Sequence, residues 1–254
     1  MLQTAVEAAR RAGEVIVERY PAGHTLTVKG HRDIATEVDT AAEAIILDLV
    51  RARFPDHAIL SEEAGGSGIG DGYTWVVDPL DGTTNYAHRL PIFSVSIGVL
   101  EGGEPLVGVV HDPLRDHTFI AERGAGARVD GTPLRVSRVD WLERAVVGLD
   151  WGHSDAERER TLDAVRQVAP RCTTVRALGS AALALAYVAA GWLDAYFNLM
   201  MKPWDVAAGT LLVSEAGGRC TTLEGGPYRV DLPGCVGTNG CIHGELLAVL
   251  KRDS

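Results

Sequence analysis

The sequence predicts a mixed fold, part α+β and part α/β, made of two fused lobes. Two amphipathic helical patterns open the chain, at 2–19 and 36–54. Short β-type segments broken by glycine, proline and Asp-Gly follow over 92–136, which is typical of an antiparallel meander. From 145 to 251 strand-like and helix-like segments alternate. Such alternation predicts an α/β lobe packed against the first, α+β lobe.

The two opening helices follow from the spacing of their apolar residues. In the first, Val6, Ala9 and Ile16 recur at intervals that place them on one face of a helix. The second continues to about residue 54 and ends before Pro55, because proline lacks the N–H that a helix interior needs. Both helices therefore have one face that must pack against another layer.

The remaining elements are predicted from β-type runs and from the later alternation. The segment 57–60 is a short strand, and 74–78 is a second strand that leads into an acidic run. The glycine-rich segment 65–72 lies between these two strands, and a role as a lid over the acidic run stays open for it. We expect the later strands at 92–100, 106–111, 117–121, 127–136, 145–149, 172–175, 193–197, 218–222 and 234–238, and the later helices at 154–168, 179–190, 204–216 and 240–251.

Net charge, cysteine content and the length of the apolar stretches limit which partners the protein is expected to bind. The 254 residues carry a formal net charge of −10, which disfavours contact with the phosphate backbone of a nucleic acid. The four cysteines have neither the density of a disulfide framework nor zinc-site spacing, so we expect reduced thiols and a cytoplasmic location. No signal-peptide pattern opens the chain, and the longest apolar stretch, 181–193, is shorter than the ~18 residues of a membrane span. We therefore expect neither nucleic acid nor membrane as a direct partner.

The run Asp78-Pro79-Leu80-Asp81-Gly82 is the strongest local indication of chemistry. In an extended chain the Cα atoms of its two aspartates would lie roughly 10 Å apart, too far to share one small cation. Proline and glycine at these positions favour a turn that brings the carboxylates together and exposes the Leu80 carbonyl. Carboxylate and carbonyl oxygens are the ligands that Mg²⁺ prefers. Taken alone, such a run is most often a solvated turn.

Neighbouring segments add to this run. Residues 82–84 supply backbone N–H groups beside the carboxylates, and a helix beginning there would suit phosphate oxygens. Glu62, at the end of the preceding predicted strand, completes an acidic cluster. Asp205 opens the predicted helix at 204–216. An aspartate there is usually a helix cap, and it can equally be a metal ligand on a rigid element.

Two long motifs are then decisive. They read WVVDPLDGTTNYAHRLP over 75–91 and WDVAAG over 204–209, the second followed by EAGG at 215–218. In this order they resemble the two signatures of the inositol monophosphatase family. The members of that family are magnesium-dependent, lithium-sensitive phosphatases. The similarity extends over nearly the whole chain.

The resemblance implies the architecture as well as the class of protein. It implies one domain over 1–254 with the layered αβαβα sugar-phosphatase fold, which divides into an N-terminal α+β lobe of about 1–140 and a C-terminal α/β lobe of about 141–254. A homodimer is implied by the family alone.

The same resemblance implies roles for individual residues. Two Mg²⁺ ions are expected, and Glu62 would also support a third, weaker site. Thr83, paired with Asp39, would orient the attacking water and help to deprotonate it, and Glu62 is the third implied catalytic residue. The implied metal ligands are Glu62, Asp78, Leu80 (through its carbonyl), Asp81 and Asp205. The implied substrate contacts are Asp81, Gly82, Thr83, Gly179, Ser180, Ala182, Asn198 and Asp205.

The expected substrate is a small polyol or sugar phosphomonoester. The Asp-Gly-Thr-Thr-Asn form of the first motif resembles the inositol-using members, so myo-inositol monophosphate is the leading candidate. Those members typically carry a glutamate seven residues before the Asp205 position, where this chain has Asn198. An asparagine donates and accepts hydrogen bonds without adding charge. Fructose-1,6-bisphosphate, histidinol phosphate and NADP therefore stay open as substrates.

A second reading, of a different class, is a regulatory protein that binds a transcription complex, as some bacterial relatives do. Other conspicuous residues are given ordinary interpretations. Isolated histidines such as His111 and His153 are interpreted as hydrogen-bonded surface groups, because magnesium does not select imidazole. Lys29 either approaches the substrate phosphate or is a solvated charge.

Overall fold

Helices and strands appear in the computed structural model close to where the sequence predicts them. The structure describes residues 1–20, 25–66 and 68–251. The first half folds into α1 (Leu2–Arg19), β1 (Leu26–Gly30), β2 (Asp33–Thr36), α2 (Glu37–Arg53), β3 (Ala58–Ser61), β4 (Gly65–Gly66), β5 (Tyr73–Asp81), α3 (Thr83–Ala87), β6 (Ser94–Glu101), β7 (Glu104–Asp112), β8 (His117–Glu122), β9 (Gly126–Val129) and β10 (Thr132–Pro133).

The second half adds a further sheet and its helices. Its elements are η1 (Leu142–Arg144), β11 (Val146–Leu149), α4 (Asp155–Val168), η2 (Ala169–Arg171), β12 (Thr174–Ala177), α5 (Ala181–Ala189), β13 (Ala195–Asn198), α6 (Pro203–Glu215), β14 (Arg219–Thr221), β15 (Cys235–Thr238) and α7 (His243–Leu250). Local chemistry accounts for several starts: the Thr36 and Ser154 side chains cap α2 and α4 reciprocally with an acidic residue three positions on.

Two large sheets carry the fold. The first has eight strands in the order β10-β9-β8-β7-β6-β5-β3-β4, antiparallel except for the parallel pair β3 and β5. The second has five strands in the order β12-β11-β13-β15-β14. In it β11 runs parallel to both β12 and β13, whereas β15 is antiparallel to its neighbours. The strands of the first sheet thus end by residue 133, and those of the second begin at 146.

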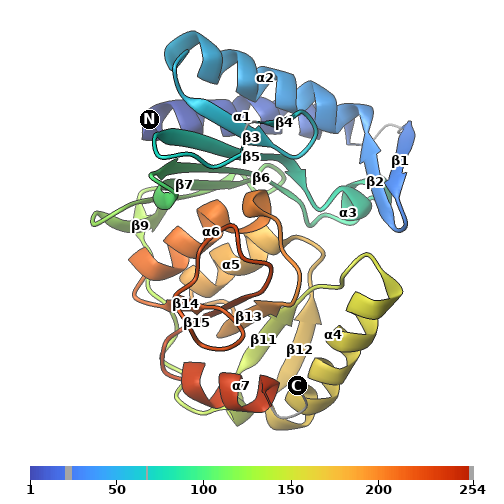
Figure 1. Cartoon of the computed structure of the whole chain (residues 1–254), viewed down its shortest axis with the longest axis vertical. Coiled ribbons are helices and arrows are strands. Elements are labelled where there is room, and N and C mark those ends of the chain that lie inside the picture. The colour runs from blue at the N-terminus through green and yellow to red at the C-terminus, as the bar shows by residue number, and fades with distance from the viewer. Residues whose placement is uncertain (21–24, 67, 252–254) are drawn as a thin grey trace.

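The sheets and helices stack as five layers (Figure 1). Helices α1 and α2 cover one face of the first sheet, and α5 and α6 lie between the two sheets. Helices α4 and α7 cover the outer face of the second sheet. This is the αβαβα layering that the sequence predicts.

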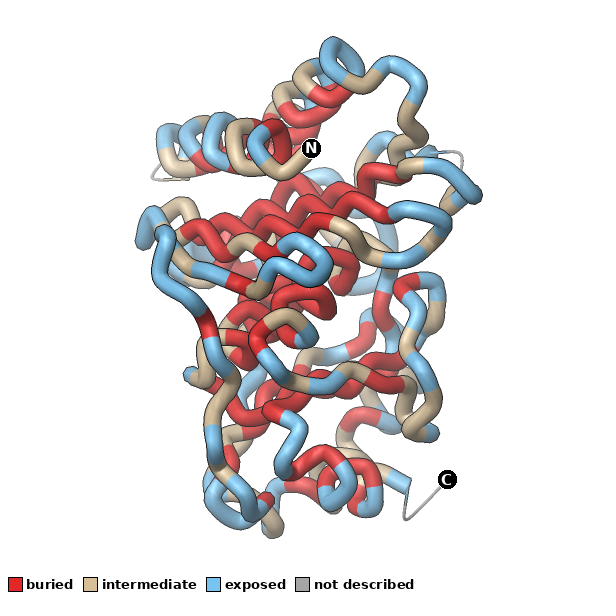
Figure 2. The backbone as a smooth tube through the Cα atoms, turned by 90° about the vertical axis from the view of Figure 1, so that its left-hand side faces the viewer, coloured by how far each residue is buried: buried red, intermediate tan, exposed pale blue. Residues whose placement is uncertain are grey.

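Three groups of buried apolar residues fill the spaces between the layers (Figure 2). One lies between α1, α2 and the first sheet, and includes Ile46 and Trp75. Another lies around α5 and α6, and combines Phe119 of the first half with Leu212 of the second. The third lies beneath α4 and α7. Because the middle group draws on both halves, the halves are held together by a shared hydrophobic core.

Helix α6 approaches the first sheet closely enough to require glycine on two strands. A Cβ on Gly98 would lie 2.6 Å from the Cβ of Ala207, and one on Gly108 would lie 2.7 Å from the carbonyl oxygen of Ala208. We therefore expect Gly98→Val to lower the free energy of unfolding by about 1–3 kcal/mol, the usual cost of overpacking. Urea denaturation measures it. Gly244→Ala is the matched control, because a Cβ there meets nothing within 4 Å; equal destabilisation by both variants would contradict this interpretation.

The structure also differs from the predictions in several places. The strand predicted at 127–136 is divided into β9 and β10, which pair antiparallel. The hairpin β1–β2 was not predicted, although Leu26 and Val28 alternate with polar residues along β1; every residue of that strand is exposed. Strand β5 continues through 78–81 with an irregularity in its pairing, whereas the sequence predicts that the strand ends in a turn there. In the segment 65–72, residue 67 lies outside the described residues. Among the described residues no helix is long and apolar enough to cross a membrane, and all four cysteines are free thiols.

Candidate active site

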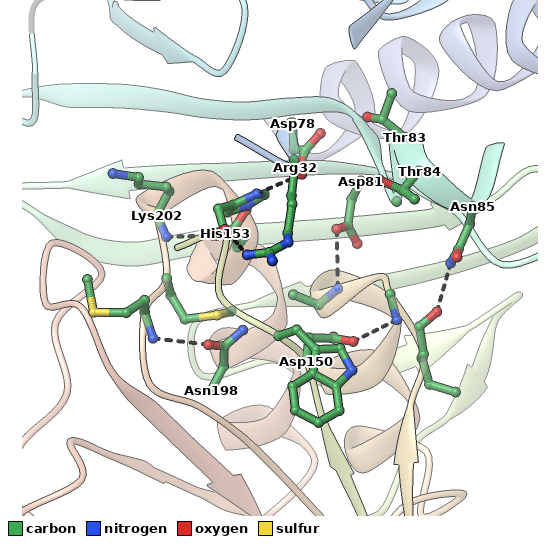
Figure 3. Close-up of a pocket in the computed structure, with 18 of the residues that line it drawn as sticks. Arg32, Asp78, Asp81, Thr83, Thr84, Asn85, Asp150, His153, Asn198 and Lys202 are labelled. Atoms are coloured by element: carbon green, nitrogen blue, oxygen red, sulfur yellow. Dashed lines mark hydrogen bonds between the residues drawn. The ribbon is translucent and has the colours of Figure 1, made fainter. Parts of the chain in front are cut away.

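A pocket of about 510 Å³ opens where the ends of strands from both sheets meet. The first half contributes residues at the ends of β3 and β5 and in α3. The second half contributes the segments that follow β11, β12 and β13, and the first turn of α6. Figure 3 shows Asp78, Asp81 and Thr83 on one side of this pocket, and Asp150 and Asn198 on the other. The described residues of the glycine-rich segment 65–72 are not part of its lining.

The irregularity in β5 sets the positions of Asp78 and Asp81. The pairing with β6 shifts between these two residues, so the strand bends without ending. The Leu80 N–H donates to Asp78 Oδ1 at 3.0 Å, a local bond that turns the carboxylate back along the chain. The Leu80 side chain is buried, and its residue lines the pocket. A bulge thus brings the two carboxylates to one pocket, where the sequence predicts a turn.

Asp81 is held by the start of α5. Its Oδ2 accepts hydrogen bonds from the Ser180 hydroxyl and, at 2.9 Å, from the Ala182 N–H. Its Oδ1 accepts from the Ala181 N–H at 3.2 Å. Ser94 Oγ adds a donor at 3.3 Å. The orientation of this carboxylate is therefore fixed by a segment about a hundred residues away in the chain.

Glu62 and Asp205 complete the acidic group from two other elements. The Lys29 ammonium, on the β1–β2 hairpin, donates to Glu62 Oε1 at 2.9 Å and also to Glu63. The Asp205 Oδ2 accepts from the Lys202 N–H at 2.7 Å and so caps α6. Asp205 thus caps a helix, as one interpretation has it, and also lines the pocket, where its role as a metal ligand stays a prediction.

Burial makes the ionised state of these aspartates costly. Loss of hydration, followed by the charge of Glu62, raises the pKa of Asp78 well above its usual range. Burial also raises the pKa of Asp81 to about 6 and that of Asp205 to about 8. Four acidic side chains in one pocket therefore repel one another, and a nearby cation would relieve that repulsion.

The side chains at the pocket offer the oxygen donors that magnesium prefers, but these donors do not converge on one point. Within the described part of the chain, no three acidic, histidine or cysteine side chains form a ready-made metal-binding group. Each carboxylate instead accepts a bond from the protein: Asp78 from Leu80, Asp205 from Lys202, and Glu62 from Lys29. All of these ligands are oxygens, as a hard cation requires.

Thr83 and Asp39 form a hydrogen-bonded pair at the pocket. The Thr83 hydroxyl can donate to Asp39 Oδ1 at 2.9 Å or to the Leu80 carbonyl at 3.0 Å. Asp39 is fully buried, and its Oδ2 accepts from the N–H and the hydroxyl of Thr36. Burial raises the pKa of Asp39. A hydroxyl of this kind can take a proton from a bound group while it passes its own proton to the buried carboxylate.

Glycine is required at two neighbouring positions of the wall. Gly82 has φ 98° and Gly179 has φ 70°, a left-handed region that favours glycine. A Cβ on Gly82 would lie 3.0 Å from the Gly179 carbonyl oxygen, so the two backbones touch. Asn85 fixes this contact, because its amide donates to the Ile92 and Leu178 carbonyls, each at 2.7 Å. The N-terminal end of α3 is thereby anchored to the second half of the chain.

Comparison with known proteins agrees with the motifs and the geometry. The profile of the inositol monophosphatase family matches residues 1–253. The chain belongs to this family. It is 44% identical to the Nus factor SuhB of Salmonella typhimurium over all of this chain and 96% of that protein.

Solved structures of the inositol monophosphatase family match closely as well. An extragenic suppressor protein SuhB from Bartonella henselae superposes with a TM-score of 0.93 at 35% identity, covering 99% of this chain and 98% of that one. An IMPase from Thermotoga maritima has a TM-score of 0.91 at 36% identity, covering 98% and 96% of the two chains. The layered fold is therefore that of these family members.

Most residues that the family motifs single out meet at this pocket. The predicted site residues that line it are Glu62, Asp78, Leu80, Asp81, Gly82, Thr83, Gly179, Asn198 and Asp205. Asp39 lies behind Thr83, outside the lining as described. Ser180 and Ala182 were predicted as substrate contacts, but the structure directs the Ser180 hydroxyl and the Ala182 N–H to Asp81. Among the described residues of this segment, Gly179 and Ala181 form the pocket wall instead.

Several pocket residues were not found from the sequence. Asp150 and Trp151 follow β11 and carry no motif that marks them as functional. His153 is an exposed, hydrogen-bonded residue as predicted, with its Nδ1 3.1 Å from the Arg32 carbonyl oxygen, and it also lines the pocket. The surface interpretation is wrong for His111, which is buried and bonded to Thr118. Only the packing of the two halves brings these loops to the site.

Proposed function

We propose that the protein hydrolyses small polyol or sugar phosphomonoesters in a magnesium-dependent reaction, with myo-inositol monophosphate as the leading substrate. The observation that carries this proposal is the convergence of Glu62, Asp78, Asp81 and Asp205 on one pocket, beside the backbone of Gly82. Family membership supports the same class of reaction. Fructose-1,6-bisphosphatase, histidinol-phosphatase and NADP phosphatase activities are the alternative specificities within this class.

The acidic side chains would hold the metal ions. We assign Glu62, Asp78 and the Leu80 carbonyl to one ion, and Asp78, Asp81 and Asp205 to a second. The raised pKa values of the aspartates support this assignment, because a cation removes the cost of their ionisation. When bound, such ions lower the pKa of the attacking water and stabilise charge on the leaving alkoxide.

The protein's own groups would orient and deprotonate the nucleophile. With its hydrogen donated to Asp39, the Thr83 hydroxyl has lone pairs free to accept a hydrogen bond from water. The pair would then move a proton from water toward the buried carboxylate. The N–H groups of Gly82 and Thr83 would bind phosphate oxygens. Ser180 and Ala182 would act through Asp81, by fixing its carboxylate.

A phosphate-release panel tests the proposal. Purified protein, stripped of metal with a chelator, is assayed with myo-inositol 1-phosphate, fructose-1,6-bisphosphate, histidinol phosphate and NADP, before and after Mg²⁺ is added. We expect turnover only with Mg²⁺, because four uncompensated carboxylates would repel a phosphate dianion. The inositol ester should be cleaved best. Equal rates with and without metal would contradict the mechanism, and preference for another ester would correct the substrate.

A second function has one specific observation in its favour. The relative from Salmonella typhimurium, 44% identical over the whole chain, is named a Nus factor. We propose that this chain also binds a transcription complex, through a surface separate from the pocket. The net charge of −10 favours a protein component over RNA as the direct contact. Failure of immobilised RNA polymerase to retain the purified protein would contradict this second function.

A further inference from the structure

Asp150 is an acidic pocket residue that the proposed reaction does not use. It follows β11 directly and lines the pocket opposite Asp78 and Asp81 (Figure 3). Its Oδ1 accepts from the Gly179 N–H at 2.7 Å, and its Oδ2 accepts from the Tyr196 hydroxyl at 3.0 Å. Two bonds from rigid elements therefore fix the plane of this carboxylate.

Among the described residues, Asp150 has no cationic partner. None of the ion pairs found among residues 1–20, 25–66 and 68–251 involves it. A carboxylate offers about four acceptor positions, and the Gly179 N–H and the Tyr196 hydroxyl occupy only two of them. Loss of hydration raises the pKa of Asp150 to about 7. The carboxylate therefore keeps acceptor capacity at the pocket that no donor in the described part of the chain fills.

Asn198, the nearby polar residue predicted to contact substrate, is already engaged. Its Nδ2 donates to the Tyr196 hydroxyl at 3.4 Å, and its Oδ1 accepts from the Met200 N–H at 3.0 Å. The side chain is buried and neutral. Through Tyr196 it supports Asp150, and only one N–H and one lone pair of its amide remain for other partners.

Asp150 also lies next to the proposed phosphate position. The Gly179 N–H binds Asp150, and the Gly179 carbonyl oxygen touches Gly82 on its other side. A group bonded to Asp150 and a phosphate held at Gly82 would thus lie on the two sides of Gly179. Trp151, two-fifths exposed, adds an apolar wall to the same pocket. A cyclic polyol offers both an edge of hydroxyl donors and an apolar ring face.

We propose that Asp150 determines substrate specificity in this chain by accepting hydrogen bonds from polyol hydroxyls adjacent to the phosphate. This assignment rests on the proposed phosphatase function and adds the residue that selects hydroxylated substrates. Tyr196 and Asn198 are positioning residues, because they act through Asp150. A site built to bind a hydroxyl discriminates against substrates without one, since its acceptor is then left unpaired in the pocket.

The test compares Asp150→Asn with the unaltered protein on two esters in the presence of Mg²⁺. Myo-inositol 1-phosphate has the hydroxyls, and phenyl phosphate lacks them. We expect the ratio of kcat/KM for the inositol ester to that for phenyl phosphate to fall by about tenfold or more, mainly through KM. Asp163→Asn is the matched control, because it removes an exposed carboxylate on α4 that is not among the lining residues, and it should leave the ratio unchanged.

Inositol phosphates lacking single hydroxyls identify the contact. When the hydroxyl that Asp150 binds is removed from the substrate, kcat/KM of the unaltered protein should fall by about tenfold. The same removal should change kcat/KM of Asp150→Asn little, because the variant has already lost that interaction. Tyr196→Phe, which keeps the carboxylate but removes one anchor, should shift the ester ratio in the same direction by less.

Four results would decide against the assignment. Equal losses on both esters in Asp150→Asn would show a general structural effect, and so would a deoxy series in which the variant loses as much as the unaltered protein. If Asp150→Asn does not fold, an unchanged ester ratio in Tyr196→Phe overturns it. Absence of phosphate release from either ester by the unaltered protein would overturn the proposed function itself, and with it this assignment.

Discussion

Asp78→Asn is expected to abolish phosphate release and, at the same time, to stabilise the metal-free protein. The activity loss should reach about 10³-fold or more, because removing a charged ligand from the proposed metal cluster forfeits several kcal/mol of transition-state stabilisation. Asp78 is 2% exposed and is the aspartate assigned to both ions. Steady-state phosphate release with saturating Mg²⁺ measures the loss.

The gain in stability has an electrostatic cause. Burial and the neighbouring acidic charges raise the pKa of Asp78, so holding it ionised in the folded protein costs free energy that an amide does not. We expect the free energy of unfolding without metal to rise on the order of 1–3 kcal/mol at pH 7. Asp163→Asn, at an exposed position, should change neither property. A variant that keeps near-normal turnover, or one that is destabilised without metal, would remove Asp78 from the cluster.

The same electrostatics predict how the metal-free protein responds to pH. The folded pKa values of Asp81, about 6, and Asp205, about 8, lie above the ordinary value near 4 of an unfolded chain. Between pH 4 and 8 the folded state therefore binds more protons, and stability from these groups falls as pH rises. Urea midpoints without metal should thus decrease from pH 5 to 8. Saturating Mg²⁺ should flatten this dependence, and an unchanged slope would contradict metal binding at these groups.

Thr83→Ala is expected to lower kcat by about 10²–10⁴-fold, the range for loss of general acid–base catalysis. The variant removes the only described side-chain hydroxyl that bonds to both Asp39 and the Leu80 carbonyl. Thr83→Ser keeps the hydroxyl and should restore most of the rate. Because the hydroxyl acts with Asp39, the double variant Thr83→Ala/Asp39→Asn should be little worse than Thr83→Ala alone.

Stability must be measured beside these rates. Asp39 also caps α2 through Thr36, so Asp39→Asn is expected to cost about 0.5–2 kcal/mol of stability as well as activity. Thr83→Ala lacks that second effect. Additive losses in kcat from Thr83→Ala and Asp39→Asn, with both proteins folded, would show that the two residues act independently.

The elements of this fold were largely predictable because their hydrophobic spacing is local. Helix α1 has buried alanines on one face, and the strands from β6 to β9 alternate with clear turn residues. The hairpin β1–β2 was not predicted, although Leu26 and Val28 alternate with polar residues along β1. That alternation serves no core, because both side chains are exposed, and a run this short is therefore weak evidence for a strand.

For the site, the sequence by itself determined the chemical kind of the candidate ligands. The motifs around Asp78, Asp81 and Asp205 specify oxygen donors, whereas the turn that they predict between Asp78 and Asp81 is a bulge within β5. Tertiary structure decided what those groups do to one another. Ser180 orients Asp81 from about a hundred residues away, and Asp150 faces the pocket only because β11 ends beside Gly179. The physical reason is that burial, repulsion between carboxylates and the direction of a hydrogen bond depend on distances in space, and spacing along a chain does not fix these distances.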